Sequence, residues 1–422
     1  NLAVLMIALF ALKEKIRLWP QARTAQLLTA GLILCAIPTT LTNTDALVFE
    51  VMPNTDPIKF ITNVIPGQSW HDLGSVLAIQ LLALVPFLLG RHFLASEDGL
   101  REILLALTVG GLVYSIPALF EIRFSPQINI QIYGFFQHDF AQMIRQGGYR
   151  PIVFLTHGLW VAILMATSLL ACAALARHAP PDDRFKMFLL VAYLFVLLVL
   201  CKSLASLLYG IAFLPAVLFL PRRWQVWLAC FIGLLAVAYP MLRNGHFIPL
   251  DWILDRAGEI SVDRQQSLGY RFNNEEQLLA RASEKPLFGW GAWGRNLFRD
   301  PETGMILTVP DGRWIIIFGA FGWLGYICEF GLLSLPLWLT LWSLRRKETL
   351  SPWVAPLCLI LGMTMLDMLL NDTLTPVTWL IAGAILGHAE RRMPRTVEIP
   401  DRETNRTVLS GGRTGGGRRT VL

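Results

Sequence analysis

Charged side chains gather where the chain leaves its apolar stretches, and the first group surrounds a diglycine. Within 132–158, Arg145 and Arg150 flank Gly147–Gly148, and Pro151 begins an apolar stretch. Proline favours the first position of a helix, so we expect Arg150 beside the free N–H groups of a helix N-terminus. A guanidinium and a helix N-terminus both attract negative charge, so the segment predicts an anion site.

The same segment allows two interpretations for each of its candidates. Arg150 either binds a substrate anion or reaches the phosphates of surrounding lipids. His157 is expected about two turns further into the helix, on one face with Phe154. It is either a structural histidine, hydrogen-bonded inside the bundle, or a group that takes part in chemistry.

A second group lies in a long polar segment near the middle of the chain. The pattern GYRFNNEEQLLARA predicts a helix over 267–283, with Arg271 near its start and Arg281 near its end. Glu275 and Glu276 are expected to be exposed. Arg271 and Glu275 are four residues apart, so they could form an ordinary surface pair of about 0.3–0.5 kcal/mol. The alternative is that Arg271, Arg281 and Glu276 bind substrate.

Carboxylates next to or inside later apolar runs form the third group. Asp311 and Arg313 precede an apolar run, and Asp311 is a candidate general base or a counter-ion for an arginine. Glu329 lies within that run, where an ionisable side chain is expensive and suggests function. Asp367 and Asn371 end a later run, where a hydrogen bond between helices explains them equally well.

The run Gly289–Gly294 spells GxGxxG, but its context argues against a dinucleotide site. Such a site needs a preceding strand, a following helix and a parallel βαβ unit. Here a helix and Pro286 come first. We expect the glycines to allow a tight turn, with Trp290 and Trp293 anchored at the membrane interface. No cofactor is predicted.

The six cysteines all lie in apolar stretches, with no CxxC and no Cys/His spacing suited to zinc. We interpret them as buried thiols and predict no metal site.

Composition identifies the kind of protein that must position these residues. Of 422 residues, 54% are hydrophobic and only 16% are charged, whereas soluble domains average about 45–50% and about 25%. This excludes an ordinary cytosolic enzyme, a disordered chain and a nucleic-acid-binding chain, so no nucleic acid partner is expected. The chain is predicted to be an all-α polytopic membrane protein in contact with the lipid bilayer.

Apolar length predicts about 11 transmembrane helices, the first of them truncated, and a twelfth helix in the full chain. The expected spans are 1–12, 24–42, 73–95, 102–120, 151–176, 186–201, 203–220, 225–242, 314–344, 353–371 and 374–389. Lys and Arg fall in alternate loops, which the positive-inside rule assigns to the cytoplasm.

The predicted organisation therefore has four parts. Residues 1–242 hold eight transmembrane helices with outer loops 43–72 and 121–150, and residues 243–313 form a large outer loop carrying short helices. Residues 314–390 hold the last three spans, and 391–422 form a disordered basic cytoplasmic tail.

Several of these features together resemble the O-antigen ligase/polymerase superfamily, which groups lipopolysaccharide O-antigen ligases with Wzy-type polysaccharide polymerases. The resemblance rests on many spans, a large late outer loop, Arg271 opening a helix that is followed by PLFGWGAWG, and the helix GAFGWLGYICEFGLL. Arg150 resembles the other essential arginine of that family. The likeness spans most of the chain, although its motifs are loose.

The resemblance implies a GT-C-like, metal-independent, inverting glycosyltransferase of the bacterial inner membrane. Its donor would be an undecaprenyl pyrophosphate-linked oligosaccharide, used at the periplasmic face, and its acceptor a glycan or lipid A-core. Chain-length regulators or export proteins are further possible partners.

Ligases of this family commonly carry a histidine where this chain has Asp311-Gly312-Arg313. That difference favours a polymerase of exopolysaccharide or O-antigen over a ligase, with Asp311 as the substitute base and His157 or Glu276 as alternatives. The resemblance makes Arg150, Arg271 and Asp311 the catalytic candidates. Arg145, Arg281, Arg313, His157 and Glu276 complete the predicted substrate site. A lipid-linked oligosaccharide flippase is the alternative from another class.

Overall fold

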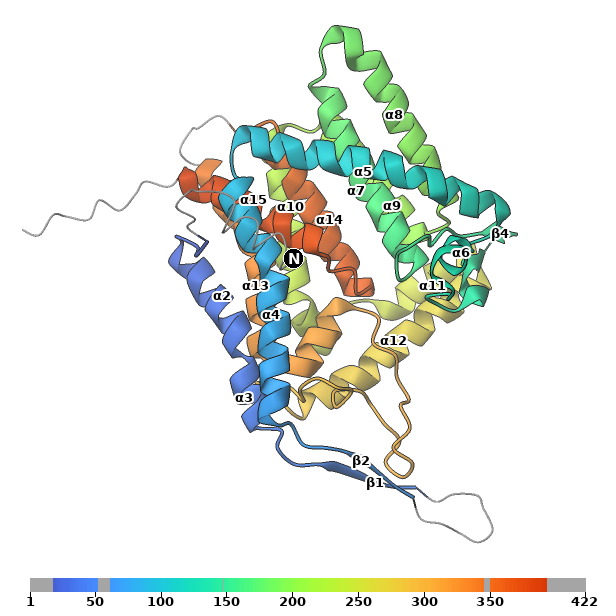
Figure 1. Cartoon of the computed structure of the whole chain (residues 1–422), viewed down its shortest axis with the longest axis vertical. Helices are drawn as coiled ribbons and strands as arrows, with labels where there is room; N and C mark the ends of the chain where they lie inside the picture. Colours follow the sequence, from blue (N-terminus) through green and yellow to red (C-terminus); the bar gives the residue numbers. More distant parts are fainter. Residues whose placement is uncertain (1–17, 52–60, 146, 345–349, 393–422) are drawn as a thin grey trace, which may run out of the picture.

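The computed structural model describes residues 18–51, 61–145, 147–344 and 350–392, and these are mostly helical (Figure 1). The helices are α2 (Arg23–Leu34), α3 (Ala36–Leu41), α4 (Trp70–Phe93), α5 (Glu97–Phe124), α6 (Ile128–Tyr133), α7 (Gly158–Arg177), α8 (Pro181–Leu200), α9 (Leu204–Phe219), α10 (Arg222–Asn244), α11 (Leu250–Ile260), α12 (Val262–Ser283), α13 (Arg313–Ser343), α14 (Val354–Leu370) and α15 (Pro376–Arg391). Two hairpins, β1 (Leu47–Val51) with β2 (Ile61–Ile65) and β3 (Ile144–Arg145) with β4 (Gly148–Tyr149), are antiparallel.

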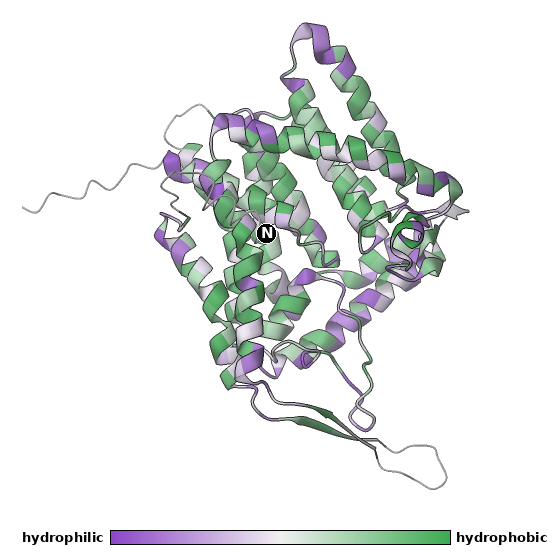
Figure 2. Cartoon of the chain, viewed as in Figure 1, coloured by the Kyte–Doolittle hydropathy of each residue, from purple (hydrophilic) through white to green (hydrophobic). Residues whose placement is uncertain are grey.

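Six stretches among the described residues are long and apolar enough to cross a membrane, as expected for an all-α membrane protein. They are α2 with α3, α4, α5, α7, α10 and α13. Apolar residues cover these helices, whereas polar residues mark α12 and the turn before α8 (Figure 2). Each predicted span from 24–42 onward overlaps a helix, while 1–12 and all but the first two residues of the predicted tail 391–422 lie outside the described residues.

Local signals explain where several helices begin. Ser69 and Asp72 form a reciprocal capping box at the start of α4. The Ser96 side chain accepts from the backbone N–H of Gly99 at the start of α5. Thr375 caps α15, whose first residue is Pro376.

Helix α7 packs against α5, α8, α9 and α14. Small residues such as Ala162, Ala166 and Ala173 are fully buried along it, so neighbouring helices can approach closely. Most of α14 is likewise buried. Helices α7 and α14 therefore contribute much of the buried core, and the loops that follow or precede them start from fixed positions.

The predicted span over 314–344 coincides with α13, but this helix is interrupted at Gly322. This residue has φ 61° and ψ −159°, a conformation essentially restricted to glycine. An added Cβ atom would also lie 2.5 Å from the backbone of Leu287 and Pro286. The helix therefore consists of two pieces that meet at Gly322.

The segment 286–291 supplies backbone partners for this break. The N–H groups of Trp323 and Leu324 donate to the carbonyls of Pro286 and Leu287 at 2.8 and 3.2 Å. In the other direction, the amides at positions 290 and 291 donate to the carbonyls at 319 and 320, both at 2.9 Å. Backbone groups freed by a break inside an apolar bundle must be paired in this way.

The GxGxxG run thus has a structural role at the break. Gly289 has φ +69°, and an added Cβ atom would lie 2.4 Å from the carbonyl carbon of Ala320, so only glycine fits against α13 there. Trp290 is buried rather than anchored at an interface, with Arg281 and Lys285 against its ring. Trp293 is exposed.

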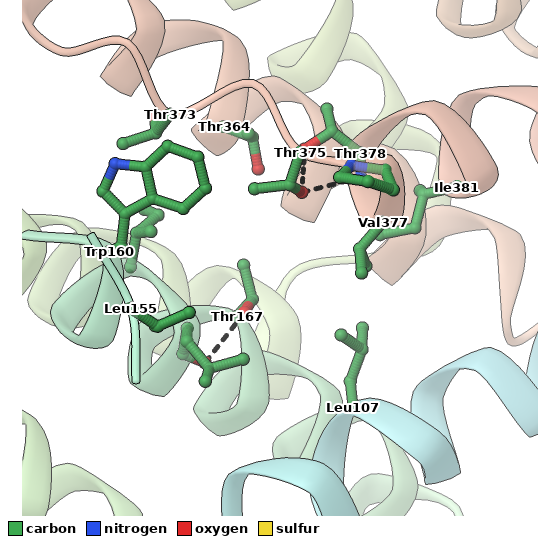
Figure 3. Close-up of a pocket in the computed structure, with 13 residues that line it drawn as sticks. Leu107, Leu155, Trp160, Thr167, Thr364, Thr373, Thr375, Val377, Thr378 and Ile381 are labelled. Atoms are coloured by element: carbon green, nitrogen blue, oxygen red, sulfur yellow. Dashed lines mark hydrogen bonds between the residues drawn. The ribbon is translucent and has the colours of Figure 1, made fainter. Parts of the chain in front are cut away.

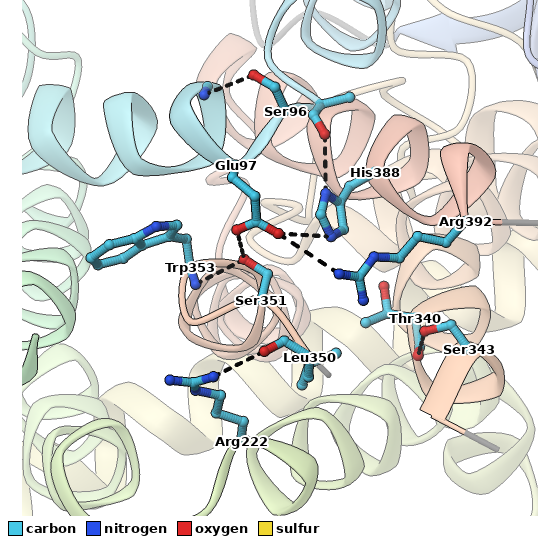
Figure 4. A network of polar contacts seen from close by, with 12 residues as sticks. Ser96, Glu97, Arg222, Thr340, Ser343, Leu350, Ser351, Trp353, His388 and Arg392 are labelled. Carbon is cyan, nitrogen blue, oxygen red and sulfur yellow. Dashed lines mark hydrogen bonds and ion pairs between the residues drawn. The ribbon is translucent and has the colours of Figure 1, made fainter. Parts of the chain in front are cut away.

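At the opposite end of the bundle from α12, polar side chains join α5 to the start of α14 and the end of α15 (Figure 4). Glu97 accepts a hydrogen bond from Ser351 and faces Arg392 and His388, each at 3.8 Å. His388 Nδ1 pairs with the Ala95 carbonyl at 3.0 Å. These contacts fix the start of α5, the segment before α14 and the end of α15 relative to one another.

Candidate functional site

Arg150 is buried near the N-terminal end of α7. The residue is only 5% exposed, and among the described residues its Nε has no hydrogen-bond partner. Its one side-chain hydrogen bond within the described residues runs from Nη2 to the Lys202 carbonyl at 3.4 Å. A buried cation with so few partners is unfavourable unless an anion completes the site.

The position of Arg150 beside a helix N-terminus arises differently from the sequence-based expectation. Helix α7 begins at Gly158 rather than Pro151, and the residues between them are irregular. An added Cβ atom on Gly158 would lie 2.4 Å from Cδ of Arg150. The Arg150 side chain therefore packs against the first residue of α7. The free N–H groups of that helix end add to the positive potential around the guanidinium.

Other cations surround Arg150, and no carboxylate within the described ranges forms an ion pair with it. Burial, with added repulsion from Arg145 and Arg271, lowers the pKa of Arg150 to about 10. Arg145 is exposed, and its carbonyl accepts from Lys202 Nζ at 2.8 Å. The turn between α8 and α9, which holds Lys202 at φ +52°, thus adds a further cation.

His157 is the N-cap of α7, not a residue two turns inside it. Its Nδ1 accepts from the Leu159 N–H at 2.9 Å, so the neutral ring carries its proton on Nε2. Burial, with added repulsion from Arg150 and His138, lowers the pKa of His157 to about 3. The His138 and His157 rings lie 4.4 Å apart. At neutral pH His157 is therefore an uncharged hydrogen-bond donor.

Arg271 joins the loop before α13 to the turn between α14 and α15. Its Nε lies 3.5 Å from Asp311 Oδ2, and its Nη1 donates to Asn371 Oδ1 at 3.2 Å and to the Leu370 carbonyl at 3.3 Å. The surface pair with Glu275, one of the two alternatives for Arg271, does not form, because Asp311 takes that place. Burial raises the pKa of Asp311, opposed by Arg271.

Arg313 binds Glu329 through two contacts of 2.6 Å and lies 3.7 Å from Asp372. Its charge is thus balanced within the protein. The Asp367 carboxylate accepts hydrogen bonds from Asn371 at 2.9 Å and Thr373 at 2.6 Å. These bonds fix the turn between α14 and α15, to which Arg271 donates.

Glu275 is buried, which contradicts the expectation that it is exposed. The residue is 3% exposed, and its carboxylate accepts from Trp314 Nε1 at 3.3 Å. Arg243, itself 3% exposed, lies 3.8 Å from Glu275 and 3.0 Å from the exposed Glu276. Burial raises the pKa of Glu275 to about 7, despite the Trp314 hydrogen bond and Arg243.

Arg281 does not join Arg150 and Arg271. It lies ten residues beyond Arg271 on α12, about 15 Å at helical rise. Its guanidinium contacts Glu284 at 2.7 Å and lies 3.3 Å from the centre of the Trp290 ring. The structure thus separates one predicted site residue from the others.

An apolar cavity of about 270 Å³ lies between α5, α7 and the turn before α15 (Figure 3). Trp160 and Leu155 line it on the α7 side, and Thr373 and Thr375 line the facing side. A second hollow of about 490 Å³ shares Leu107, Leu164 and Val377 with it and extends to Leu94 and Glu102. Leu155 and Thr373 place one end near the irregular segment that follows Arg150 and near the turn that Arg271 contacts.

Sequence reasoning left three residues of this region out of the predicted site. Lys202 carries no motif, Arg243 resembles an ordinary helix-end cation, and Glu275 reads as exposed. A local signal existed for Lys202 alone, since a lysine between two apolar runs marks a helix boundary. The contacts of Arg243 and Glu275 depend on tertiary packing.

Within the described residues, no group of three or more His, Cys, Asp or Glu side chains is arranged to hold a metal ion. No known family model matches the chain, and no curated protein sequence matches it.

Proposed function

We propose that the protein is an integral-membrane glycosyltransferase that polymerises glycan repeat units from an undecaprenyl pyrophosphate-linked donor. In this proposal about 11 transmembrane helices form a GT-C-like arrangement in a bacterial inner membrane, with Arg150 and Arg271 at the periplasmic face. A Wzy-type polymerase is the first choice, and an O-antigen ligase acting on lipid A-core is the alternative.

One observation carries the proposal: Arg150, which is buried and has no carboxylate partner among the described residues, lies near the end of an apolar cavity. Arg150 is 5% exposed and is repelled by Arg145 and Arg271, so it favours an anion with several charges. The cavity of about 270 Å³ favours an aliphatic chain. A ligand that satisfies both has an anionic head and a long apolar tail, as a polyprenyl pyrophosphate does.

The same residues suggest how transfer proceeds. The bond between the sugar anomeric carbon and the pyrophosphate oxygen breaks, and its electron pair stays on that oxygen. Fixed arginines at positions 150 and 271 stabilise the charge that develops there. The acceptor hydroxyl attacks from the opposite face, and its proton passes to Asp311. Burial strengthens Asp311 as a base, and Arg271 at 3.5 Å holds it in place.

A lipid-linked oligosaccharide flippase is the second candidate, and the break in α13 favours it. Transporters commonly place broken helices at their substrate pathway, and Gly322 interrupts α13 inside the bundle. The hollow that reaches Glu102 also continues away from Arg150. The transferase remains the first choice, because Arg313, the cation nearest the break on α13, is neutralised by Glu329.

The deciding experiment uses the full chain in nanodiscs with an undecaprenyl pyrophosphate-linked repeat unit, with and without lipid A-core. A ladder of lipid-linked multimers without core identifies a polymerase, and product only with core identifies a ligase. Chain-length regulators are left out, so the ladder reports the protein alone. Absence of released undecaprenyl pyrophosphate in both reactions would contradict the transferase, and movement of the substrate between leaflets would then support the flippase.

A further inference from the structure

A groove separate from the Arg150 region runs between the β1–β2 hairpin and the end of α12. It has a volume of about 350 Å³ and is lined by Phe49, Phe298, Arg281, Glu284 and Arg299, among others. Its walls are well fixed. Leu307 N–H donates to the Phe298 carbonyl at 3.1 Å, and an added Cβ atom on Gly304 would lie 2.8 Å from the Phe49 ring.

The charges of this groove differ from those around Arg150. Arg281 is paired with Glu284 at 2.7 Å and held against the Trp290 ring, so its charge is already balanced. Arg299 donates to the carbonyls of Gly304 and Gly294 at 2.9 and 3.4 Å. A groove in which one arginine is paired with a carboxylate and the other is held by backbone carbonyls suits a ligand rich in hydrogen-bonding groups.

The lining also combines two kinds of contact that suit a sugar chain. Phe49 and Phe298 offer aromatic surface, whose negative face attracts the C–H groups on one side of a sugar ring. Arg281 offers planar donors and Glu284, whose side chain is 53% exposed, offers two acceptor oxygens to the hydroxyl edge. A lipid tail would leave both the donors and the acceptors of this pair unused.

Helix α12 links this groove to the proposed reaction centre. Arg271 and Arg281 lie on that one helix, about 15 Å apart at helical rise. A glycan whose pyrophosphate lies at Arg271 therefore needs only a few sugar units along α12 to reach the groove.

We propose that the groove between Phe49, Phe298 and the Arg281–Glu284 pair binds a segment of the glycan several sugars away from the transferred bond. This inference rests on the proposed function, and it assigns Arg281 to glycan binding instead of pyrophosphate binding. The groove positions the growing chain, so it affects how long the product becomes more than how fast one unit is transferred.

The test measures binding of glycan fragments to the full chain in nanodiscs. The probe is the host cell's own surface polysaccharide, partially hydrolysed with acid, labelled with a fluorophore at its reducing end and followed by anisotropy. The variants are Phe298→Ala and Glu284→Gln. Phe185→Ala, at an exposed site on α8, and Glu259→Gln, which breaks a similar exposed Arg–Glu pair on α11, are the matched controls.

We expect both groove variants to bind the fragments about tenfold more weakly, with both control variants unchanged. Glu284→Gln removes one exposed charge and leaves the fold intact. It therefore still tests the groove if the Phe298→Ala protein does not fold. Unchanged binding in both groove variants, or no fragment binding by the wild-type protein, would overturn the inference. Undecaprenyl pyrophosphate binding, measured on the same samples, should stay unchanged in both variants. Its absence from the wild-type protein would instead contradict the proposed function.

Discussion

The Arg313 guanidinium forms a two-point ion pair with the Glu329 carboxylate, each contact 2.6 Å, although sixteen residues separate them along α13. Sixteen residues of straight helix span about 24 Å, which is further than these two side chains can bridge. The pair therefore exists only because the helix changes direction at Gly322. The N-terminal part of α13 thus folds back toward Glu329, close to the contact between Arg271 and Asp311.

Removing one partner of this pair should destabilise the protein strongly. Glu329 is buried, so Arg313→Met leaves an uncompensated carboxylate, and we expect a loss of about 3–5 kcal/mol. Arg256→Met breaks an exposed pair on α11 and should lose less than about 1 kcal/mol. The free energy of unfolding in mixed micelles measures both. Equal losses for the two variants would argue against the folded-back arrangement.

The glycine at the break should be intolerant of substitution. Gly322→Ala places a side chain at φ 61° and within 2.5 Å of the backbone of 286–287, so we expect at least about 1–3 kcal/mol of destabilisation from backbone strain. Gly74→Ala in α4 meets no atom within 4 Å and should be neutral or stabilising. Thermal unfolding of both variants in detergent provides the comparison. A stable Gly322→Ala protein would show that α13 is continuous.

The buried Glu275 should make stability depend on pH in a defined window. Burial raises its pKa from 4.5 to about 7, so between these values the folded protein holds a proton that the unfolded chain has released. Stability contributed by this group is therefore fully present below pH 4.5 and falls as pH rises to about 7, by about 3 kcal/mol.

Glu275→Gln isolates this contribution. His157, whose pKa is lowered to about 3, shifts stability in the opposite direction with pH, so the informative quantity is the difference between the two proteins. We expect Glu275→Gln to gain stability relative to wild type as pH rises from 4.5 to 7, measured by thermal unfolding. A constant difference across that range would mean that Glu275 titrates normally.

The limits of sequence reasoning in this fold follow from particular residues. Apolar length predicts the helices, because each must bury or present a long apolar surface. The break at Gly322 is invisible in the uninterrupted apolar run GAFGWLG, since the chain at 286–291, more than thirty residues earlier, supplies its hydrogen bonds. The β1–β2 hairpin was missed for a related reason, as five-residue strands carry little periodic signal.

The candidate site was predictable only in part. Arg150, Arg271 and Asp311 stand out because charged residues flank apolar runs, and a helix-end signal places Arg150 near α7. Spacing alone leaves a pair between Arg271 and Glu275 open, but it cannot show that Arg271 contacts Asp311, forty residues further along the chain. The burial of Glu275 depends on Trp314 and Arg243, which lie far from it in sequence.

Transfer of glycan units should not depend on a divalent metal ion, since the proposal assigns charge stabilisation to arginines. In the nanodisc reaction, excess EDTA is expected to leave the yield of multimers unchanged. A loss of product that added Mg²⁺ restores would show that a metal ion neutralises the pyrophosphate.

The most direct test of the account is the affinity of the nanodisc-embedded protein for undecaprenyl pyrophosphate, compared with undecaprenol, by native mass spectrometry. Arg150→Ala should weaken pyrophosphate binding at least about tenfold, which corresponds to about 1.4 kcal/mol, and leave undecaprenol binding unchanged. Arg256→Ala, on exposed α11, should change neither. Equal affinity of wild type and Arg150→Ala for the pyrophosphate would contradict the central claim that Arg150 binds the anionic head of a lipid-linked substrate.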